Sequence, residues 1–360
     1  MTSENQASSE AAQTGQLSSV AHHDDGQNKK LEALSSVYPG LLVAGTISIA
    51  ATWLSSHYGT PAMLLALLLG IAFNFLGDDA RCKAGIEFSC RTLLRIGVAL
   101  LGVRITFDQL QSLGVLPVAM VVSGVLLTIL FGILLARAFK FSYSFGVLTG
   151  GSVAICGASA ALAISSVLPN TKHSEQNTLL AVVAVTTLST IAMVVYPVIA
   201  ASLDLTTSEA GLFLGGTIHD VAQVVGAGYS VSEGTGDIAT YVKLLRVAML
   251  MPVVFVIAII VANSAKHVSD ARPGIPLFLV GFAMLVVVSS TINLPEQAIS
   301  GISSVSSWCL ITAISALGVK TSFGKIATLG WKPLFIIIME TVWIALLVLG
   351  FVLVLHAQNH

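Results

Sequence analysis

The stretch LGVRITFDQLQSLGVLP, residues 101–117, returns 216 residues later as LGVKTSFGKIATLGWKP, residues 317–333. Seven of the 17 aligned positions are identical, and a second pair, YGTPAML from Tyr58 and PGIPLFL from Pro273, is offset by 215. Two echoes at nearly the same offset indicate that several consecutive segments are duplicated. In a hydrophobic chain, such a duplication is typical of secondary transporters built from two repeats around a central site.

The composition predicts an all-α membrane protein. Of the 360 residues, 55% are hydrophobic and 10% are charged, whereas about 25% are charged in an ordinary soluble domain. A hydrocarbon core about 30 Å thick needs roughly 20 apolar residues per helix, and the alternating pattern of a membrane barrel is absent. We expect about eleven transmembrane helices, near residues 37–55, 59–76, 90–106, 113–138, 143–168, 175–202, 207–228, 236–262, 275–293, 296–318 and 333–356.

The basic residues predict the orientation of these helices. If all eleven segments cross, one side of the membrane carries Arg104 and Lys172 and the other carries eleven Lys and Arg residues. Because basic residues concentrate in cytoplasmic loops, we expect a cytoplasmic N-terminus and an external C-terminus. The eleven residues of the basic side are Lys29, Lys30, Arg81, Lys83, Arg137, Lys140, Lys266, Arg272, Lys320, Lys325 and Lys332.

The count of crossings also predicts an inverted repeat. The duplicated stretches belong to the third and tenth segments, and an odd number of crossings separates them, so the two copies run in opposite directions. We expect segments one to four to be repeated by segments eight to eleven. The polar residues 1–36 form a disordered cytoplasmic tail, and the transporter domain covers 37–356, as a first repeat over 37–138, central Gly-rich segments over 143–228 and a second repeat over 236–356.

The fifth and seventh segments are rich in glycine, and both contain Gly-Gly-[Ser/Thr]-[Val/Ile], at 150–153 and 215–218. One interpretation is close packing of helices through small residues. The other is that each helix breaks at its Gly-Gly pair, so that half-helices starting at Ser152 and Thr217 aim backbone N–H groups at a bound anion. The second interpretation gives as substrate-binding candidates Gly150, Gly151, Ser152, Gly157, Ser159, Gly215, Gly216 and Thr217.

Titratable side chains in these apolar segments are candidates for ion coupling. His219, Asp220 and Gln223 directly follow the second Gly-Gly pair, and Glu340 lies within the last segment. An acidic residue at membrane depth is costly and needs a polar surrounding. Asp220 either carries a coupling proton or cation, with His219 as a relay, or caps the following half-helix; for Glu340, pairing with a base and proton coupling both stay open.

Two bases within apolar segments are candidates for attracting an anion. Arg95 and Arg246 lie deeper in their segments than Arg91 and Lys243, although helix-end bases also extend to the lipid headgroups. The four cysteines show no metal-ligand spacing, so we expect free thiols, no metal and no cofactor. The phosphate-binding motif of ATPases is absent as well, which favours coupling to an ion gradient over ATP hydrolysis. A metal-dependent hydrolase that uses His219 and Asp220 would need further ligands at membrane depth, and only Glu340 is available, so we do not expect an enzyme.

Four stretches together resemble the YeiH-type family of bacterial membrane proteins, usually labelled sulfate exporters. They are TGGSVAICGASAALAISS, GGTIHDVAQVVGAGYSV, LLRIGVALLGVRITF and SALGVKTSFG, and the resemblance runs from about residue 37 to the C-terminus. It implies a protein of the bacterial inner membrane, distantly similar to transporters of the bile acid and Na⁺/H⁺ antiporter fold, in which two discontinuous helices cross. Here the two Gly-rich segments are not partners under the 216-residue repeat, so the crossing pair stays open.

Together these observations predict a secondary transporter of a small anion, with sulfate, sulfite or an organosulfonate favoured by the resemblance. Alternating access would be coupled to protons or ions. The alternatives are a cation/proton antiporter that uses Asp220 and a membrane sensor that does not transport. The expected partners are the anion and the lipid bilayer, with no nucleic acid, and the sequence leaves a homo-oligomer open.

Overall fold

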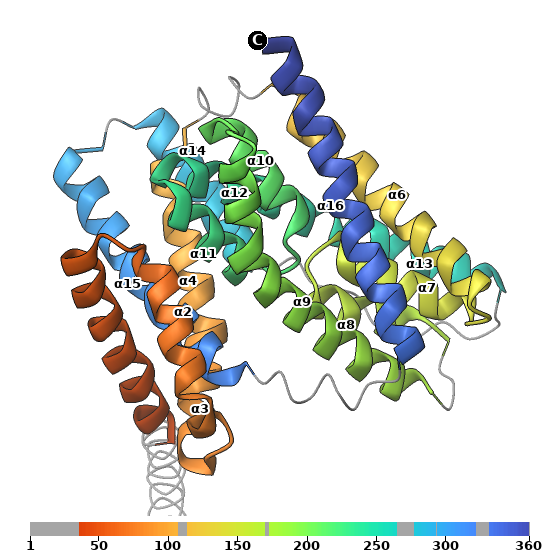
Figure 1. Cartoon of the computed structure of the whole chain (residues 1–360), viewed down its shortest axis with the longest axis horizontal. Helices are drawn as coiled ribbons and strands as arrows, with labels where there is room; N and C mark the ends of the chain where they lie inside the picture. The colour runs from red at the N-terminus through yellow and green to blue at the C-terminus, as the bar shows by residue number, and fades with distance from the viewer. Residues whose placement is uncertain are drawn as a thin grey trace, which may run out of the picture.

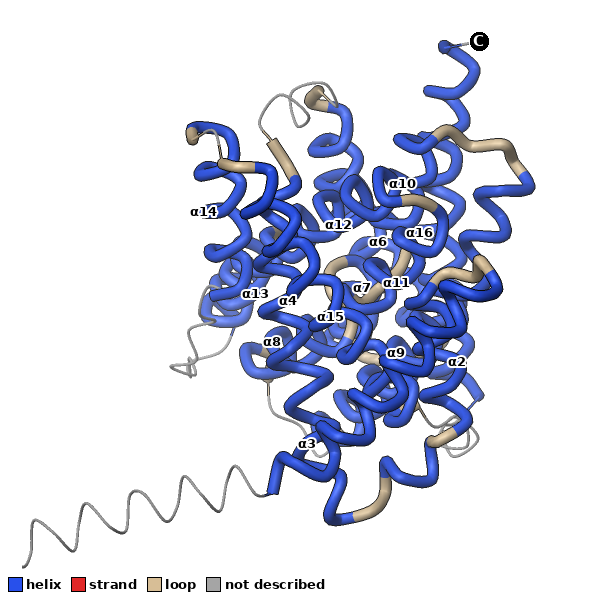
Figure 2. The backbone as a smooth tube through the Cα atoms, turned by 90° about the vertical axis from the view of Figure 1, so that its left-hand side faces the viewer, coloured by secondary structure: helices blue, strands red, loops and turns tan. Residues whose placement is uncertain are grey.

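The described part of the chain is helical throughout and forms two bundles that lie side by side (Figure 1). In this computed structural model, the described residues are 36–106, 114–169, 173–264, 277–292, 294–321 and 331–359. Strands are absent from these ranges, as Figure 2 shows. The all-α fold predicted from composition is therefore confirmed.

The first bundle combines the N-terminal helices with two helices from late in the chain. Gly40 and Gly85 lie backbone to backbone, and so do Gly70 and Gly318, because a Cβ on any of them would meet the neighbouring main chain. This close approach joins helices that are far apart in sequence. The bundle consists of the helix Ser36–Tyr58, α2 (Ala62–Ala72), η1 (Asn74–Gly77), α3 (Ala80–Phe88), η2 (Ser89–Leu93), α4 (Leu94–Leu101), η3 (Gly102–Arg104), α14 (Leu277–Thr291) and α15 (Glu296–Lys320).

The second bundle holds the middle of the chain and the C-terminal helix. In it α7 packs on α6, and α12 packs on both α10 and α11. Its helices are α6 (Leu116–Ala138), α7 (Tyr143–Ala154), α8 (Ala158–Val167), α9 (Ser174–Ser202), α10 (Thr207–Thr217), α11 (Val221–Val231), α12 (Glu233–Ala248), α13 (Leu250–Ser264) and α16 (Trp331–Asn359).

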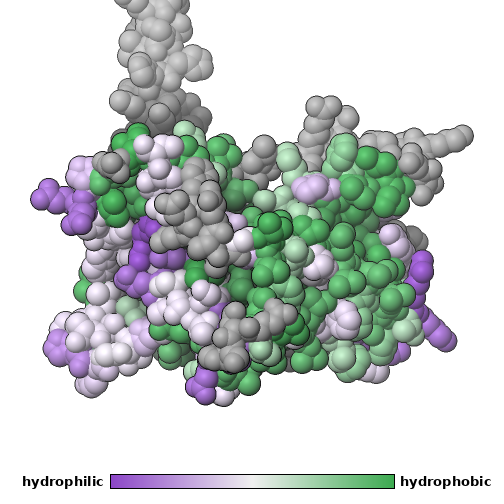
Figure 3. Space-filling model, turned by 90° about the horizontal axis from the view of Figure 1, so that it is seen from above, coloured by the Kyte–Doolittle hydropathy of each residue, from purple (hydrophilic) through white to green (hydrophobic). Residues whose placement is uncertain are grey.

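The long apolar helices agree with a membrane location. Six of the described helices are long and apolar enough to cross a bilayer, namely Ser36–Tyr58, Leu116–Ala138, Ser174–Ser202, Glu233–Val261, Glu296–Lys320 and Trp331–Ala357. Leu130 and Leu134 on α6 and Phe255 on α13 are exposed, as lipid-facing residues are. Apolar side chains also cover a wide part of the surface in Figure 3.

The predicted count of eleven spans is not confirmed. Residues 59–76 form a helix of only 11 residues followed by a 3₁₀ turn, and 90–106 contains a π-helical turn between α3 and α4. The segments 143–168 and 207–228 are each divided into two short helices. Local breaks therefore interrupt several of the apolar stretches, including the two Gly-rich segments for which a break was one of the two interpretations.

The predicted inverted repeat is not confirmed. The duplicated stretches continue into residues 107–113 and 322–330, which lie outside the described residues, as do 1–35 and several of the basic residues used for the orientation, including Lys266 and Arg272. Where the two copies enter the described helices, α4 and α15 run antiparallel. Glu87, before α4, contacts Lys320 at the end of α15, whereas Gly97, a turn inside α4, accepts a hydrogen bond from Ser306. The wider inverted repeat stays a prediction.

Candidate functional site

The two central Gly-rich helices are broken, and both breaks meet at one helix. The first break is the turn Ile155–Gly157 between α7 and α8, and the second is the turn Ile218–Asp220 between α10 and α11. The Lys243 ammonium of α12 donates to Ile155 O at 2.7 Å and to Ile218 O at 2.9 Å. One side chain therefore joins the two breaks.

Arg246, one turn further along α12, makes the same connection. Its Nε and Nη2 donate to Ala154 O and Val153 O at 2.8 and 2.7 Å, and its Nη1 donates to Ile218 O at 3.2 Å and to Gly215 O at 3.4 Å. Lys243 and Arg246 are 0% and 1% exposed. Two buried cations are tolerable here because each is surrounded by main-chain oxygens.

The physical reason is the polarity of the helix ends. The last carbonyls of a helix have no partner within it and carry the negative end of the helix dipole. The C-terminal ends of α7 and α10 both lie inside the protein, and Lys243 and Arg246 supply the missing donors. Arg246 was predicted to attract an anion, and four of the five N–H donors of its guanidinium bind these carbonyls. Its role toward an anion stays a prediction.

The start of α8 is the more open side of the first break. Gly157 has φ +62° and ψ −122° and offers no side chain to cap the helix. The Cys156 thiol accepts a hydrogen bond from the Ala160 N–H. Ala158 is half-buried and Ser159 is exposed, so the first N–H groups of α8 lie next to accessible space.

The start of α11 is capped by the chain itself. The Asp220 carboxylate accepts a hydrogen bond from the Ala222 N–H at 3.0 Å, and the Asp220 N–H donates to the Ser189 hydroxyl of α9 at 3.1 Å. Gln223 donates from Nε2 to Thr190 at 3.4 Å, whereas its buried Oε1 has no protein partner. The capping role predicted for Asp220 is therefore present in the structure, and its coupling role stays a prediction.

His219 links the second break to the C-terminal helix. Its Nε2 lies 3.0 Å from the Thr341 hydroxyl of α16, and that hydroxyl donates its proton to Ile337 O. Because a hydroxyl has one proton to give, Nε2 must be the donor in this contact. The tautomer of His219 is thus fixed by α16.

Glu340 lies on α16, where its carboxyl faces α6 and α7. Its Oε1 accepts a hydrogen bond from Thr149 at 2.8 Å, its Oε2 has no protein partner, and the side chain is fully buried. No basic side chain is paired with it in the described structure. Glu340 is therefore the neighbour in α16 of Thr341, which contacts His219, whereas its own hydrogen bond is to Thr149 of α7.

The predicted starts of the half-helices need correction. The breaks follow the Gly-Gly pairs by several residues, so Ser152 and Thr217 lie near the ends of α7 and α10, where their hydroxyls bond to the carbonyls of Leu148 and Phe213. The half-helices begin at Ala158 and Val221.

The Gly-Gly pairs themselves pack. A Cβ on Gly150 would meet the α6 main chain near Thr128, and one on Gly215 would lie 2.4 Å from Ala239 O of α12. On Gly151 it would meet Ile164, and on Gly216 it would meet Val348 and Met120. The close-packing interpretation describes these four glycines correctly.

Arg95, the other base predicted to attract an anion, is exposed on α4 in the first bundle. Lys243, which sequence reasoning set aside as a helix-end base, is the residue that joins the breaks. Its spacing of three from Arg246, which puts both on one helix face, was the available signal. Among the described residues, no three His, Cys, Asp or Glu side chains are grouped as metal ligands, and the four cysteines are free.

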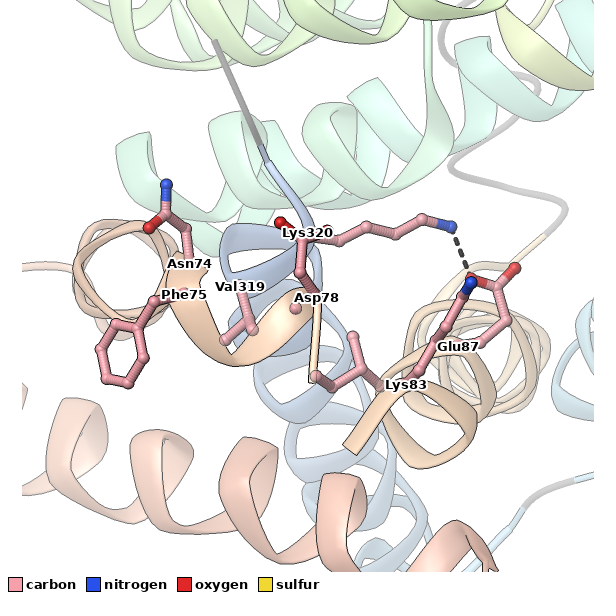
Figure 4. A pocket seen from close by; sticks show the side chains of 9 residues that line it. Asn74, Phe75, Asp78, Lys83, Glu87, Val319 and Lys320 are labelled. Atoms are coloured by element: carbon pink, nitrogen blue, oxygen red, sulfur yellow. Dashed lines mark hydrogen bonds and ion pairs between the residues drawn. The ribbon is translucent and has the colours of Figure 1, made fainter. Parts of the chain in front are cut away.

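A small pocket lies elsewhere, in the first bundle between η1, α3 and α15 (Figure 4). Its volume is about 200 Å³, and Lys320 on its wall is paired with Glu87. None of the predicted site residues lines it. The other lining residues are Asn74, Phe75, Gly77, Asp78, Lys83, Ile86 and Val319.

The chain is similar to one family of bacterial membrane proteins. The family described as conserved hypothetical protein 698 matches residues 39–337. A UPF0324 membrane protein of Chlorobaculum tepidum is 56% identical over 316 residues, which cover 87% of this chain and 88% of that protein. The UPF0324 membrane protein TauZ of Paracoccus pantotrophus is 48% identical, covering 88% of this chain and 94% of its own, and one of Rhizobium meliloti is 46% identical, covering 88% and 93%.

Proposed function

This chain belongs to the UPF0324 family of membrane proteins, consistent with the YeiH-type resemblance, and we propose that it is a secondary transporter of a small anion. Sulfate, sulfite and small organosulfonates are the substrates we would test first. We further propose that it works in the bacterial inner membrane, with a cytoplasmic N-terminus and an external C-terminus, and that a proton or ion gradient drives it. Neither a cofactor nor a nucleic acid is part of this proposal.

The observation that carries the proposal is the pair of helix breaks joined by Lys243 and Arg246. Unwound backbone within a membrane protein is tolerated where it is buried in protein or lines a cavity. Such breaks place helix ends at the depth where transporters bind their substrates. Holding two of them together on two buried cations has a large desolvation cost, which a purely structural helix pair could avoid.

The charge balance at the breaks favours an anion. The ionisable groups that interact there include Lys243, Arg246, Asp220, His219 and the Cys156 thiol. Two basic side chains thus face one carboxylate. The free N–H groups at the start of α8 add a further partial positive charge, and the exposed Ser159 hydroxyl offers a donor beside them. We propose that the anion binds there.

The coupling ion is proposed to act at Asp220. This carboxylate is partly buried, caps α11 through a single N–H, and interacts with the Lys243 charge. Protonation of Asp220 would change the charge beside the anion and leave helix α11 intact. The arrangement supports proton coupling through Asp220, with His219 as the neighbouring group that could relay the proton.

The same carboxylate supports the second candidate, a cation/proton antiporter. In that case a cation would replace the proton at Asp220, and the Lys243 side chain would compete with that cation for the Asp220 carboxylate. The two candidates differ in what crosses the membrane, so one vesicle preparation distinguishes them.

The test is flux in proteoliposomes made with the purified protein. Radiolabelled sulfate, sulfite and isethionate, an organosulfonate with a net negative charge, are each offered with and without an imposed proton gradient, and sodium flux is measured in parallel. The proposal predicts gradient-dependent flux of at least one anion, which Asp220→Asn makes independent of pH. Sodium or potassium flux without anion flux would support the antiporter, and no flux of any ion would support a sensor.

A further inference from the structure

The two bundles touch along a restricted boundary, and α11 lies at its centre. This helix of the second bundle packs against α2 and α15 of the first. Gly226 brings α11 close to Ile314 of α15, because a Cβ on this glycine would lie 3.3 Å from the Ile314 side chain. The helix that begins at the second break is therefore also a helix on which the bundles meet.

A cluster of charges crosses the same boundary near the C-terminal end of α11, the end away from the second break. Arg104, in η3 of the first bundle, pairs with Glu233 of α12 at 2.8 Å and with Asp237 at 3.6 Å. Its guanidinium also lies over the ring of Tyr229 near the end of α11, 5.6 Å from the centroid, and the Tyr229 hydroxyl donates to Asp237. Arg104 thus holds three side chains of the opposite bundle.

The cluster is more strongly held than an ordinary surface ion pair. The side chains of Arg104 and Asp237 are only 16% and 21% exposed, although Glu233 is 82% exposed. Partial burial reduces screening by solvent, and stacking on an aromatic ring adds to the attraction. Such a cluster stabilises one relative position of the two bundles.

A second charge cluster makes an internal comparison available. Glu87 binds both Arg91 and Lys320, but all three belong to the first bundle. It lies at the opposite end of the same helical segment, since the 13 residues from Arg91 to Arg104 span about 20 Å. Of the two clusters, the one at Arg104 joins different bundles.

The length of α11 connects this cluster to the proposed anion site. Asp220 caps the first turn of α11, and Tyr229 lies near its end. The helix has 11 residues and is about 16 Å long. A displacement of one end of so short and rigid an element displaces the other. Release of Tyr229 from Arg104 would therefore free the helix that carries Asp220 and Gln223.

We propose that Arg104, Tyr229, Glu233 and Asp237 form a latch that holds the two bundles together at one end of the molecule and must open during transport. The role rests on the proposed transport function, because alternating access requires one part of the protein to move against another. With the latch closed, α11 is held against the first bundle. With the latch open, α11 and the second break can move away from it.

The test measures the distance between the bundles without any substrate. Spin labels are placed at Val231 and Ile292, which are 45% and 55% exposed and lie at this end of the two bundles, since Ser289 of α14 donates to Ile105 beside Arg104. The protein in lipid nanodiscs has alanine in place of Cys82, Cys90, Cys156 and Cys309. Electron–electron double resonance then gives the distribution of label distances for Arg104→Gln, Glu233→Gln and the matched control Glu87→Gln.

The latch predicts that Arg104→Gln raises the fraction of longer distances about tenfold, the change expected when a partly buried ion pair is lost. Glu233→Gln should change it in the same direction by less, and Glu87→Gln should leave the distribution unchanged. Unchanged distributions in both latch variants, or an equal change in Glu87→Gln, would overturn the proposal. Glu233 is mostly exposed, so Glu233→Gln should fold. It therefore tests the latch even if Arg104→Gln does not fold.

A second measurement separates the latch from the transport proposal. A short bifunctional thiol reagent links Arg104→Cys to Glu233→Cys, and anion flux is measured before and after cleavage of the link. The latch predicts that flux stops and returns, whereas the same link between Glu87→Cys and Lys320→Cys leaves flux intact. Distance changes in a protein that moves no ion would keep the latch and reject the transporter; flux that continues through the linked pair would reject the latch alone.

Discussion

The two helix breaks share their C-terminal caps and differ in their N-terminal ones. At both breaks, a helix with a Gly-Gly pair ends inside the protein, and Lys243 and Arg246 bind the carbonyls there. Beyond the first break, α8 begins at Gly157, which has no side chain. Beyond the second, Asp220 precedes α11 as its N-cap, and its carboxylate accepts a hydrogen bond from the Ala222 N–H.

Under the proposed function, this difference gives the two breaks different chemistry. The N–H groups of Ala158 and Ser159 at the start of α8 would be available to an external anion, whereas the start of α11 already has an anionic group of its own. A fixed carboxylate that titrates can couple a proton or cation, and an uncapped helix start can bind an anion. The comparison teaches that similar breaks can serve substrate and coupling ion separately.

The largest expected effect comes from the part that both breaks share. Arg246→Met leaves the carbonyls of Val153 and Ala154 without donors inside the protein, and we expect a loss of about 3–5 kcal/mol of stability. Thermal unfolding in detergent measures this loss. Arg91→Met, at a mostly exposed pair, is the control and should cost less than about 1 kcal/mol. Equal stability of the two variants would show that the cap is not structural.

The next effect is specific to the first break. Gly157→Ala places a Cβ on a backbone with φ +62° and ψ −122°, although the space itself is free, since the nearest atom would lie 3.6 Å away. The backbone strain should cost about 1–3 kcal/mol. Gly45→Ala, at a helical glycine with open space, should be neutral or stabilising. If both variants unfold alike, the left-handed turn does not constrain the break.

The third effect concerns the cap of the second break. Asp220→Ala should cost about 1 kcal/mol, whereas Asp220→Asn should cost little, because Asn caps a helix about as well as Asp. Asp220→Asn should nevertheless remove the pH dependence of anion flux. A wild-type pH profile in this variant would move the coupling role to Glu340, for which Glu340→Gln is the corresponding test.

The broken helices could be predicted from the sequence, because four glycines within one apolar span have no use in a plain lipid-facing helix. The position of the breaks could not. Gly150 and Gly215 were expected to unwind the helices, but they allow α7 and α10 to approach α6 and α12 closely. A Gly-Gly pair signals close approach and helix breaking equally well, and only the packing partners decide between them.

The C-terminal caps of α7 and α10 could not be predicted from the sequence either. The sequence showed that Lys243 and Arg246 lie on one helix face. It could not show that they bind main-chain carbonyls, because those carbonyls reach them only where three helices meet, and no local sequence pattern encodes that meeting. Arg95 looks similar in sequence and is exposed. Depth within an apolar segment therefore does not predict burial when two bundles share a boundary.

The most direct test of the central claim is sulfate binding to Ser159→Asp, measured by calorimetry on the purified protein. Ser159 is exposed in the first turn of α8, where an acidic residue stabilises a helix by about 0.3–1 kcal/mol. If the anion binds at this helix start, the new carboxylate should weaken binding a hundredfold or more, since like charges about 4 Å apart repel by about 4 kcal/mol at an effective dielectric constant of about 20. The neutral Ser159→Asn should bind within a few fold of the wild type. If Ser159→Asp is stably folded and binds sulfate as tightly as the wild type, the anion does not bind at the start of α8.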